Sequence, residues 1–359
     1  MTSASVKADS LKAFDLAEKS LRGEALTRAE ALSVLNWDEA DFLTLLSAAF
    51  RVRQAYFGKK VKLNFLVNIQ SGLCAEDCHY CSQSKLSDTP VEKYRLMSAA
   101  DVITAAARAV ANKASRLCMV ASMRGPSEKD LDAVAQAVRQ VKEKYPQLEI
   151  CACLGLLKDG QAATLGAAGV GAYNHNLNTS ERHYDQICST HTFADRVDTV
   201  DKAHSGGLST CSGALFGMGE THEDILDVAY RLRQLNVDSI PINFLIPFKG
   251  TPLGKVQNLT PAFCLRVLCL FRLLCPRSEL RIAGGRELHL RSLQPMGLYV
   301  ANSIFIGDYL TSEGQAPQLD LEMIRDLGFE IVGQPSESEP LLNLADRVAL
   351  TSREARLAR

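Results

Sequence analysis

Short apolar runs alternate with amphipathic segments along most of the chain after residue 60. The runs are continuously apolar, as in strands buried on both faces, and the segments between them place apolar residues at helical spacing. This alternation predicts an α/β fold in which helices cover a parallel sheet. Eight such units fit a closed (β/α)8 barrel of the TIM type. The runs are VKLNFLVNI (61–69), SRLCMVAS (115–122), LEICACLG (148–155), GAYNHNL (171–177), LSTCSGALFG (208–217), DSIPINFLIP (238–247), LRIAGG (280–285) and NSIFIG (302–307).

The alternative architecture is a doubly wound parallel sheet, which normally carries a phosphate-binding turn. GTPLGK (250–255) looks like part of a P-loop, but it is one residue short and is followed by Val256 instead of Ser or Thr. GALFGMGET (213–221) has the glycines of a tight turn without a dinucleotide fingerprint. Both segments are therefore predicted to be ordinary turns, and the barrel is favoured.

Helices are predicted before the barrel and a polar tail after it. Apolar positions recur at helical spacing in LTRAEALSVLN (26–36) and DEADFLTLLSAAFRVRQAYF (38–57), with Thr27 as a candidate N-cap. The stretch after GQPSESEP (333–340) is polar and then rich in arginine. The predicted domains are an N-terminal helical extension (1–60), the barrel (61–330) and a C-terminal tail (331–359).

Composition excludes several classes of protein. With 47% hydrophobic residues, 23% charged residues and a formal net charge of −1, the chain has no electrostatic footprint for nucleic acid or an anionic membrane. No apolar run is long enough to span a bilayer, and the polar start MTSASVKADS lacks a signal-peptide core, so a cytoplasmic location is expected. In a reducing compartment the eleven cysteines are not expected to form a disulfide framework, and clustered ones suggest metal ligation or catalysis.

Three cysteines, Cys74, Cys78 and Cys81, follow the first apolar run in a C-x3-C-x2-C pattern. In a barrel this loop lies at the C-terminal face, where active sites are built. A structural zinc site needs four ligands, usually in two spaced pairs, and His79 is poorly placed to complete one. Three thiolates suit a [4Fe–4S] cluster with one iron left open, and a zinc knuckle or chance spacing is the alternative.

A second set of cysteines lies within the predicted strands. Cys118, Cys151, Cys153 and Cys211 fall in the second, third and fifth runs, and each taken singly is explained by burial. Taken together they suggest a second cluster inside the barrel. The seventh run adds Arg281, whose buried charge requires an anionic partner such as a thiolate-bound cluster. Cys151 and Cys153 point to the same face of one strand, so spacing alone does not decide which binds iron.

Asparagines cluster at the end of the fourth run, in YNHNLNTS (173–180). Because asparagine is depleted in strands, three in one short run need a reason. They can cap backbone groups in a turn. They can also line a polar pocket, where amides both donate and accept hydrogen bonds. His175, between two of them, is expected to point the other way and to be structural.

The cysteine loop, with Tyr80 before its last cysteine, resembles the radical S-adenosylmethionine (SAM) superfamily. The resemblance implies that the amino and carboxylate groups of SAM chelate the open iron. It also implies that reduction of the cluster cleaves SAM to a 5′-deoxyadenosyl radical, which takes a hydrogen atom from an unactivated carbon.

Longer motifs resemble the biotin synthase family from about Val61 to Glu330. They are NHNLNTS, CSGALFGMGET, SIPINFLIPFKGTPL, RIAGGRE and ANSIFIGDYLTSEG. The resemblance implies a homodimeric barrel that converts dethiobiotin to biotin, with an auxiliary iron–sulfur cluster as the sulfur donor. It further implies reduced flavodoxin or ferredoxin as the electron donor.

The family's roles carry over by position, and none of them is a catalytic acid or base. The expected ligands of the SAM-binding [4Fe–4S] cluster are Cys74, Cys78 and Cys81. The expected ligands of the auxiliary [2Fe–2S] cluster are Cys118, Cys151, Cys211 and Arg281. The residues expected to contact SAM and dethiobiotin are Asn174, Asn176, Asn178 and Asn243. The cysteines expected to be structural are Cys153, Cys188, Cys264, Cys269 and Cys275.

One position departs from the family pattern: relatives carry aspartate where this chain has Asn178. An amide still bonds a hydroxyl, but without the strength that a charge adds. Two other functions are compatible with the cysteine loop. They are a different reaction on a radical SAM barrel, which need not keep the complete auxiliary ligand set, and a non-catalytic iron–sulfur carrier, which needs no SAM pocket.

Overall fold

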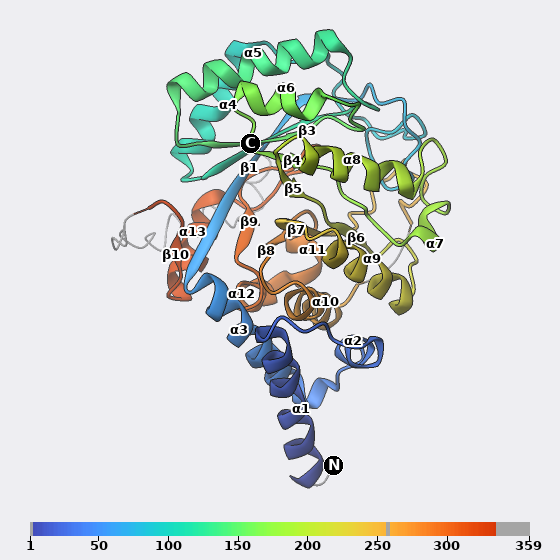
Figure 1. Ribbon diagram of the computed structural model, residues 1–359, viewed down its shortest axis with the longest axis vertical. Helices are drawn as coiled ribbons and strands as arrows, with labels where there is room; N and C mark the ends of the chain where they lie inside the picture. Colours follow the sequence, from blue (N-terminus) through green and yellow to red (C-terminus); the bar gives the residue numbers. More distant parts are fainter. Residues whose placement is uncertain (1–2, 256–258, 335–359) are drawn as a thin grey trace.

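The computed structural model describes residues 3–255 and 259–334 and contains a closed parallel barrel (Figure 1). Strand β1 (Lys60–Gln70) pairs with β2 (Arg116–Ala121) on one side and with β9 (Ser303–Phe305) on the other, which closes the sheet. All pairings in the barrel are parallel, so the predicted fold class is confirmed. The strands between β2 and β9 are β3 (Glu149–Cys153), β4 (Ala172–Asn174), β5 (Ser209–Cys211), β7 (Ser239–Phe244) and β8 (Glu279–Ile282).

The fifth predicted run is broken into two short strands. Strand β6 (Ala214–Phe216) follows β5 after two residues, and both pair with β7. Gly213 sits at the break, where a Cβ atom would lie only 1.9 Å from the carbonyl oxygen of Pro241. Only glycine allows this close approach. The break leaves Cys211 at the end of β5, facing the barrel interior.

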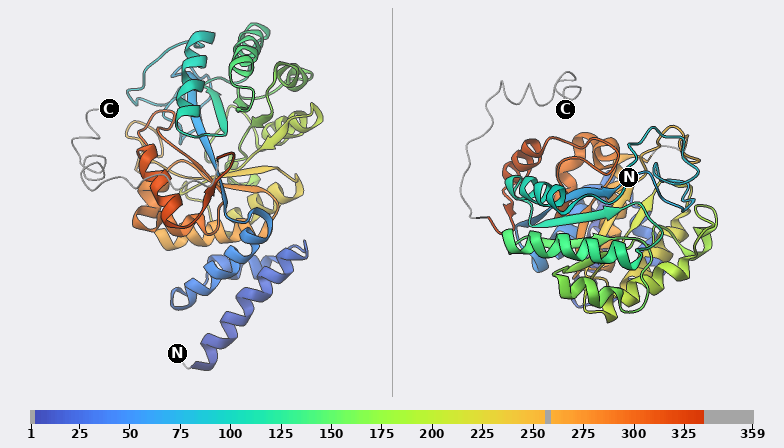
Figure 2. Two further views of the ribbon diagram at one scale, coloured as in Figure 1. Left: turned by 90° about the vertical axis from the view of Figure 1, so that its left-hand side faces the viewer. Right: turned by 90° about the horizontal axis from the view of Figure 1, so that it is seen from above.

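Helices surround the barrel, as the right-hand view of Figure 2 shows. Capping boxes at Ser127, Thr192 and Thr221 begin three of them, with the side chain of each cap accepting a backbone hydrogen bond. The long outer helices are α4 (Ala99–Ala111), α5 (Glu128–Lys144), α6 (Gln161–Ala168), α8 (Phe193–Ser205), α9 (His222–Gln234), α10 (Pro261–Leu274) and α13 (Pro317–Asp326). Shorter helices are α7 (Glu181–Tyr184), α11 (Arg286–Leu290) and α12 (Gln294–Leu298).

The helical extension predicted before the barrel is present. It consists of α1 (Ser3–Leu21), α2 (Arg28–Leu35) and α3 (Phe42–Phe57), and α2 and α3 pack against α10 at the lower side of the barrel in Figure 1. Thr27 caps α2 as predicted, in a capping box with Glu30.

A short strand was not predicted: β10 (Glu330–Ile331) pairs with the beginning of β1. It crosses the boundary that the sequence placed between the barrel and the tail, and the predicted tail beyond residue 334 lies outside the described residues. Among the helices of the described ranges, none has the length and apolar character needed to cross a membrane.

A buried ion pair joins the last barrel segments. The carboxylate of Asp320 on α13 is fully buried and accepts two hydrogen bonds from Arg286 on α11, at 2.8 and 2.7 Å. The same guanidinium donates to the carbonyl of Phe305 at the end of β9. Arg286 therefore fastens α11, α13 and the end of β9 to one another.

Replacement of Asp320 by alanine is expected to lower the free energy of unfolding by about 3–5 kcal/mol, because it leaves the buried Arg286 without its main counter-charge. Urea denaturation measures the change. The control is Asp198→Ala, which removes a half-exposed carboxylate 2.7 Å from Lys202 and should cost less than about 1 kcal/mol. Equal losses in the two variants would contradict a structural role for the buried pair.

Candidate functional site

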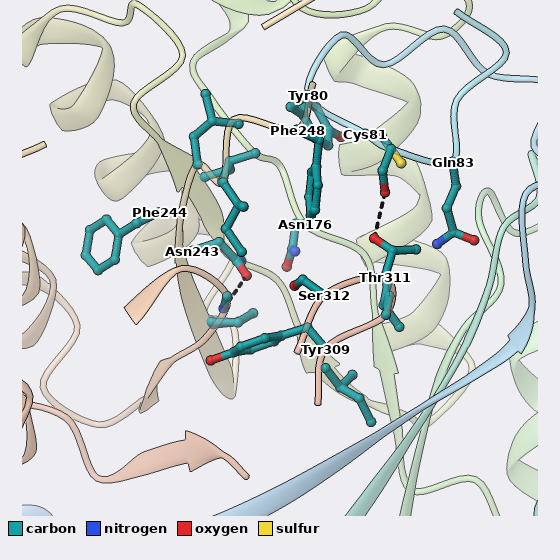
Figure 3. A pocket seen from close by; sticks show the side chains of 18 of the residues that line it. Tyr80, Cys81, Gln83, Asn176, Asn243, Phe244, Phe248, Tyr309, Thr311 and Ser312 are labelled. Carbon is teal, nitrogen blue, oxygen red and sulfur yellow. Dashed lines mark hydrogen bonds between the residues drawn. The ribbon is translucent and has the colours of Figure 1, made fainter. Parts of the chain in front are cut away.

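A cavity of about 260 Å³ opens at the carboxyl ends of the barrel strands (Figure 3). Its wall combines the loop after β1, the asparagines that follow β4, and the segments after β7 and β9. Figure 3 shows Asn176, Ser312 and the ring of Phe248 around the same space, with Cys81 and Tyr80 at one side. Active sites of (β/α)8 barrels occupy this end.

Four residues predicted to form an auxiliary site meet inside the barrel. Cys118 on β2 is the register partner of Cys151 on β3, and both belong with Cys211 to one buried cluster inside the barrel. The guanidinium Nη1 of Arg281 on β8 lies 3.6 Å from the sulfur of Cys211. All four side chains are at most 4% exposed. Phe305 packs on this group and also lines the cavity, so the two sites adjoin.

Arg281 is held by a charged network at the opposite, amino-terminal end of the barrel. Its Nη2 lies 2.5 Å from Glu279, and Arg116 bonds Glu149 at 2.8 Å and approaches Glu279 at 3.3 Å. Lys62 contacts both carboxylates. Burial alone would raise the pKa of Glu279, but the neighbouring cations lower it overall. Three cations thus face two carboxylates, and the excess positive charge lies next to the three thiols.

The protonation of the thiols responds to this environment. The hydrogen bond to Cys151, together with the charge of Arg281, lowers the pKa of Cys211 and of Cys118 despite their burial. The neighbouring thiols of Cys118 and Cys211, together with burial, raise the pKa of Cys151. Three soft, buried sulfur donors beside excess positive charge fit an anionic iron–sulfur cluster.

The remaining hydrogen bonds of Arg281 fix the orientation of its guanidinium. Nε donates to Ser303 at 3.2 Å and Nη2 donates to Ser239 at 3.0 Å, which leaves Nη1 facing the thiols. The neighbouring anions, led by Glu279, raise the pKa of Arg281 in spite of burial. A charged guanidinium has no lone pair, so in this form Arg281 offers Cys211 a hydrogen-bond donor and a positive charge.

The three-cysteine loop follows β1 and is tied to the segment before α8. The carboxylate of Asp77 accepts backbone N–H bonds from Ser189 at 2.9 Å and Thr190 at 3.2 Å. Cys78 is buried, whereas Cys74 and Cys81 are partly exposed, and Cys81 forms part of the cavity wall. Because Cys81 meets the space that a ligand would occupy, the loop could hold a [4Fe–4S] cluster beside the cavity.

The aromatic residue of the cysteine motif connects this loop to the asparagines. The amide of Asn178 donates to the hydroxyl of Tyr80 at 2.5 Å, and Arg196 approaches the same hydroxyl at 3.4 Å. Asn178 adopts a left-handed backbone conformation with φ of 69°, which asparagine and aspartate tolerate best among non-glycine residues. Its backbone is held between Gly213 and Leu215, so the side chain is fixed at the cavity wall.

All four predicted asparagines line the cavity, and three of them also hydrogen-bond each other or the nearby backbone. Asn174 donates to the sulfur of Cys211 and to the amide oxygen of Asn176, each at 3.2 Å. Asn243 accepts from the backbone of Gly284 at 3.0 Å. The asparagines therefore serve turn geometry and pocket lining at once, and Asn174 connects the cavity to the auxiliary thiols.

Other residues judged structural are buried. His175 is 6% exposed, its Nε2 has no partner among the described residues, and burial lowers its pKa. Cys153 is only partly buried, and loss of solvation at the thiol raises its pKa to about 12. The thiols of Cys264, Cys269 and Cys275, on or just after α10, are buried and have raised pKa values for the same reason.

Cys188 and His191 were assigned no binding role from the sequence, yet they lie against the cysteine loop. The sulfur of Cys188 is 3.8 Å from that of Cys78 and 3.3 Å from Nδ1 of His191. Their C-x2-H spacing was the available signal, and 110 residues separate Cys188 from Cys78 in the sequence. The wall also contains Phe248 and Tyr309, which sequence reasoning did not single out.

Comparison with known proteins shows the class of protein to which this chain belongs. Residues 68–232 match the family described as "Radical SAM superfamily", and residues 241–330 match the "Biotin and Thiamin Synthesis associated domain". Among solved structures, methylornithine synthase superposes with a TM-score of 0.77 at 19% identity, covering 93% of this chain and 99% of that one. A FeFe-hydrogenase maturase from Carboxydothermus hydrogenoformans gives 0.76 at 17% identity, covering 92% and 81%. With this barrel and cysteine loop, the chain is a radical SAM enzyme.

Curated relatives narrow the class further. A biotin synthase of Streptomyces avermitilis is 56% identical over 325 residues, which cover 90% of this chain and 84% of the relative. Biotin synthase 2 of Frankia casuarinae is 52% identical over 343 residues, which cover 95% of each chain. The chain belongs to the biotin synthase family.

Proposed function

We propose that this protein inserts sulfur into dethiobiotin to form biotin by radical SAM chemistry. The observation that carries the proposal is the group of three buried thiols and Arg281 directly beneath a cavity whose wall holds Cys81. A substrate in this cavity lies between the loop thiols and the barrel thiols. Such a position is what transfer of a sulfur atom to a carbon radical requires.

The residues fall into two ligand sets. In this proposal the loop set holds a [4Fe–4S] cluster with SAM on its open iron, and the barrel set holds a [2Fe–2S] cluster. When bound, these groups supply a 5′-deoxyadenosyl radical that removes hydrogen from the substrate, and the sulfur that replaces it. The loop set is Cys74, Cys78 and Cys81; the barrel set is Cys118, Cys151, Cys211 and Arg281, which would bind iron only after its guanidinium loses a proton.

The protein's own contribution is position and environment. The amide of Asn176, close to the cavity centre in Figure 3, can bond polar groups of dethiobiotin or SAM, while Phe248 offers an apolar surface to an aliphatic chain. Asn174, which lines the cavity, donates to the sulfur of Cys211 and so helps to orient this thiol. Enclosure within the barrel excludes water, which protects a carbon radical from side reactions.

Partners and compartment follow from the same proposal. We propose reduced flavodoxin or ferredoxin as the electron donor, a homodimer as the assembled form, and the cytoplasm as the location. All eleven cysteines are unpaired, and two groups of them are proposed cluster ligands, which suits a reducing compartment.

Addition of SAM to the reduced, cluster-containing protein tests the proposal against a non-catalytic carrier. An enzyme that binds SAM at an open iron should show a changed electron paramagnetic resonance spectrum on SAM addition. An unchanged spectrum would contradict the proposal and favour a carrier. A changed spectrum with no binding of dethiobiotin would favour a different radical SAM reaction.

The unusual residue at position 178 gives a specific expectation. Replacement of Asn178 by aspartate should lower the KM for SAM by roughly 2- to 10-fold with kcat unchanged, because a charge-assisted hydrogen bond is about twice as strong as a neutral one. Steady-state kinetics measure both constants. The control is Asn236→Asp, at an exposed residue that is also left-handed with φ of 47° and is remote from the cavity. A KM that stays constant or rises at position 178 would contradict a SAM contact there.

A further inference from the structure

A second group of metal-binding side chains shares one cysteine with the loop. Cys78, Cys188 and His191 are each at most 8% exposed, and their ligand atoms all lie within 4.8 Å of one another. Within residues 3–255 and 259–334, no other three His, Cys, Asp or Glu side chains meet this condition. Cys188 and His191 come from the segment between α7 and α8, which the proposed reaction does not use.

The distances match a single ion better than a cluster. A tetrahedral Zn²⁺ ion lies about 2.3 Å from sulfur and about 2.0–2.1 Å from imidazole nitrogen, so its ligand atoms are roughly 3.5–3.8 Å apart. The sulfur of Cys188 is 3.8 Å from the sulfur of Cys78, and it is 3.3 Å from Nδ1 and 3.8 Å from Nε2 of His191. A four-iron cluster, by contrast, spreads its thiolates over the corners of a cube.

The histidine is already oriented as a metal ligand. Its Nδ1 lies 2.6 Å from the carboxylate of Glu76, which is 5% exposed. In the tautomer that carries its proton on Nδ1, this contact leaves the lone pair of Nε2 available to a metal ion. A carboxylate bonded to the distal nitrogen is the usual outer contact of a metal-binding histidine. Asp77 fixes the segment that carries Cys188 and His191, because its carboxylate accepts hydrogen bonds from the backbone N–H groups of Ser189 and Thr190.

We propose that the cluster-free protein binds one divalent, thiolate-preferring ion, Zn²⁺ or Fe²⁺, through Cys78, Cys188 and Nε2 of His191, with water as the fourth ligand. Binding forms two metal–thiolate bonds and releases the two thiol protons to solvent, without any change of oxidation state. Because Cys78 would serve both sites, the ion and the [4Fe–4S] cluster exclude each other. This mutual exclusion rests on the proposed function, whereas the ion site does not.

Zn²⁺ binding to the anaerobic, chelator-treated full chain tests the site, with a chromophoric chelator as competitor. Cys188→Ser and His191→Gln should each reduce the number of tightly bound Zn²⁺ ions by one, through a loss of affinity of more than about 100-fold. Glu76→Gln should weaken the same ion by about 10- to 100-fold, as loss of an outer contact does. Circular dichroism shows which variants are folded. If Cys188→Ser does not fold, the loss of affinity in Glu76→Gln tests the site instead.

The matched control is Cys81→Ser, which removes a loop thiol outside this group. It should leave the number of tight Zn²⁺ ions unchanged. Loss of the ion in Cys81→Ser with retention in Cys188→Ser would overturn the proposal and place zinc on the cysteine loop alone. Retention in every variant would also overturn it. X-ray absorption at the zinc edge should show two sulfur ligands and one imidazole ligand. Three sulfur ligands would contradict the proposed site.

Reconstitution with iron and sulfide then tests the shared cysteine. Prior loading with Zn²⁺ should suppress [4Fe–4S] formation in the wild type and have much less effect in Cys188→Ser. If neither protein forms that cluster even without zinc, the proposed cluster role of the loop fails, while the zinc measurements still decide the ion site. Equal suppression in both proteins would contradict mutual exclusion through this site.

Discussion

Alanine in place of Cys151 is expected to abolish biotin formation while SAM is still cleaved to 5′-deoxyadenosine. Cys151 lies between the other two barrel thiols and is fully buried, so its loss leaves the auxiliary site with two separated sulfurs. The loop cysteines are untouched, and the radical source should therefore remain. Mass spectrometry of both products, with iron analysis of the reconstituted protein, measures the effect.

Cys153→Ala is the matched control for this prediction. Cys153 lies two residues further along the same strand, is partly buried, and is not part of the buried cluster that contains Cys118, Cys151 and Cys211. This variant should retain biotin formation and the auxiliary iron. If Cys153→Ala loses both and Cys151→Ala keeps them, the ligand assignment on β3 is wrong.

Alanine in place of Cys81 is expected to reduce both 5′-deoxyadenosine and biotin to background. Cys81 is the loop thiol that reaches the cavity wall, and a [4Fe–4S] cluster with only two protein thiolates should not persist. The auxiliary iron should stay, because the barrel thiols are unaffected. Iron content and both products are measured after anaerobic reconstitution.

Cys264→Ala controls for the general effect of removing a buried thiol. Cys264 lies on α10, outside the barrel, and is not among the proposed ligands of either cluster. Its variant should cleave SAM at the wild-type rate. Continued formation of 5′-deoxyadenosine by Cys81→Ala would contradict the proposed role of the loop.

The sequence was sufficient for the barrel because its signal is repeated eight times. Apolar runs and helical periodicity are local properties, and every predicted run overlaps an observed strand. Features that depend on contacts between distant segments were missed. The break after Cys211 depends on the carbonyl of Pro241 meeting Gly213, and β10 is only two residues long. Neither has a periodic signal of its own.

The candidate site was predictable to a similar degree. Cysteine spacing and family resemblance pointed to residues that the structure brings together in the barrel and around the cavity. The network that holds Arg281 was not predictable, because Glu279 and Arg116 meet only when the sheet closes. The contact of Cys188 with Cys78 likewise needs the loop after β1 to reach the segment before α8.

The most direct test of the central claim is turnover of the wild-type protein. The anaerobically reconstituted protein is incubated with dethiobiotin, SAM and a strong reductant, and biotin and 5′-deoxyadenosine are quantified by mass spectrometry. The account predicts that both products form and that omission of SAM removes both. 5′-Deoxyadenosine without biotin would contradict the substrate assignment, and the absence of both products from a protein that holds both reducible clusters would contradict the proposed enzyme.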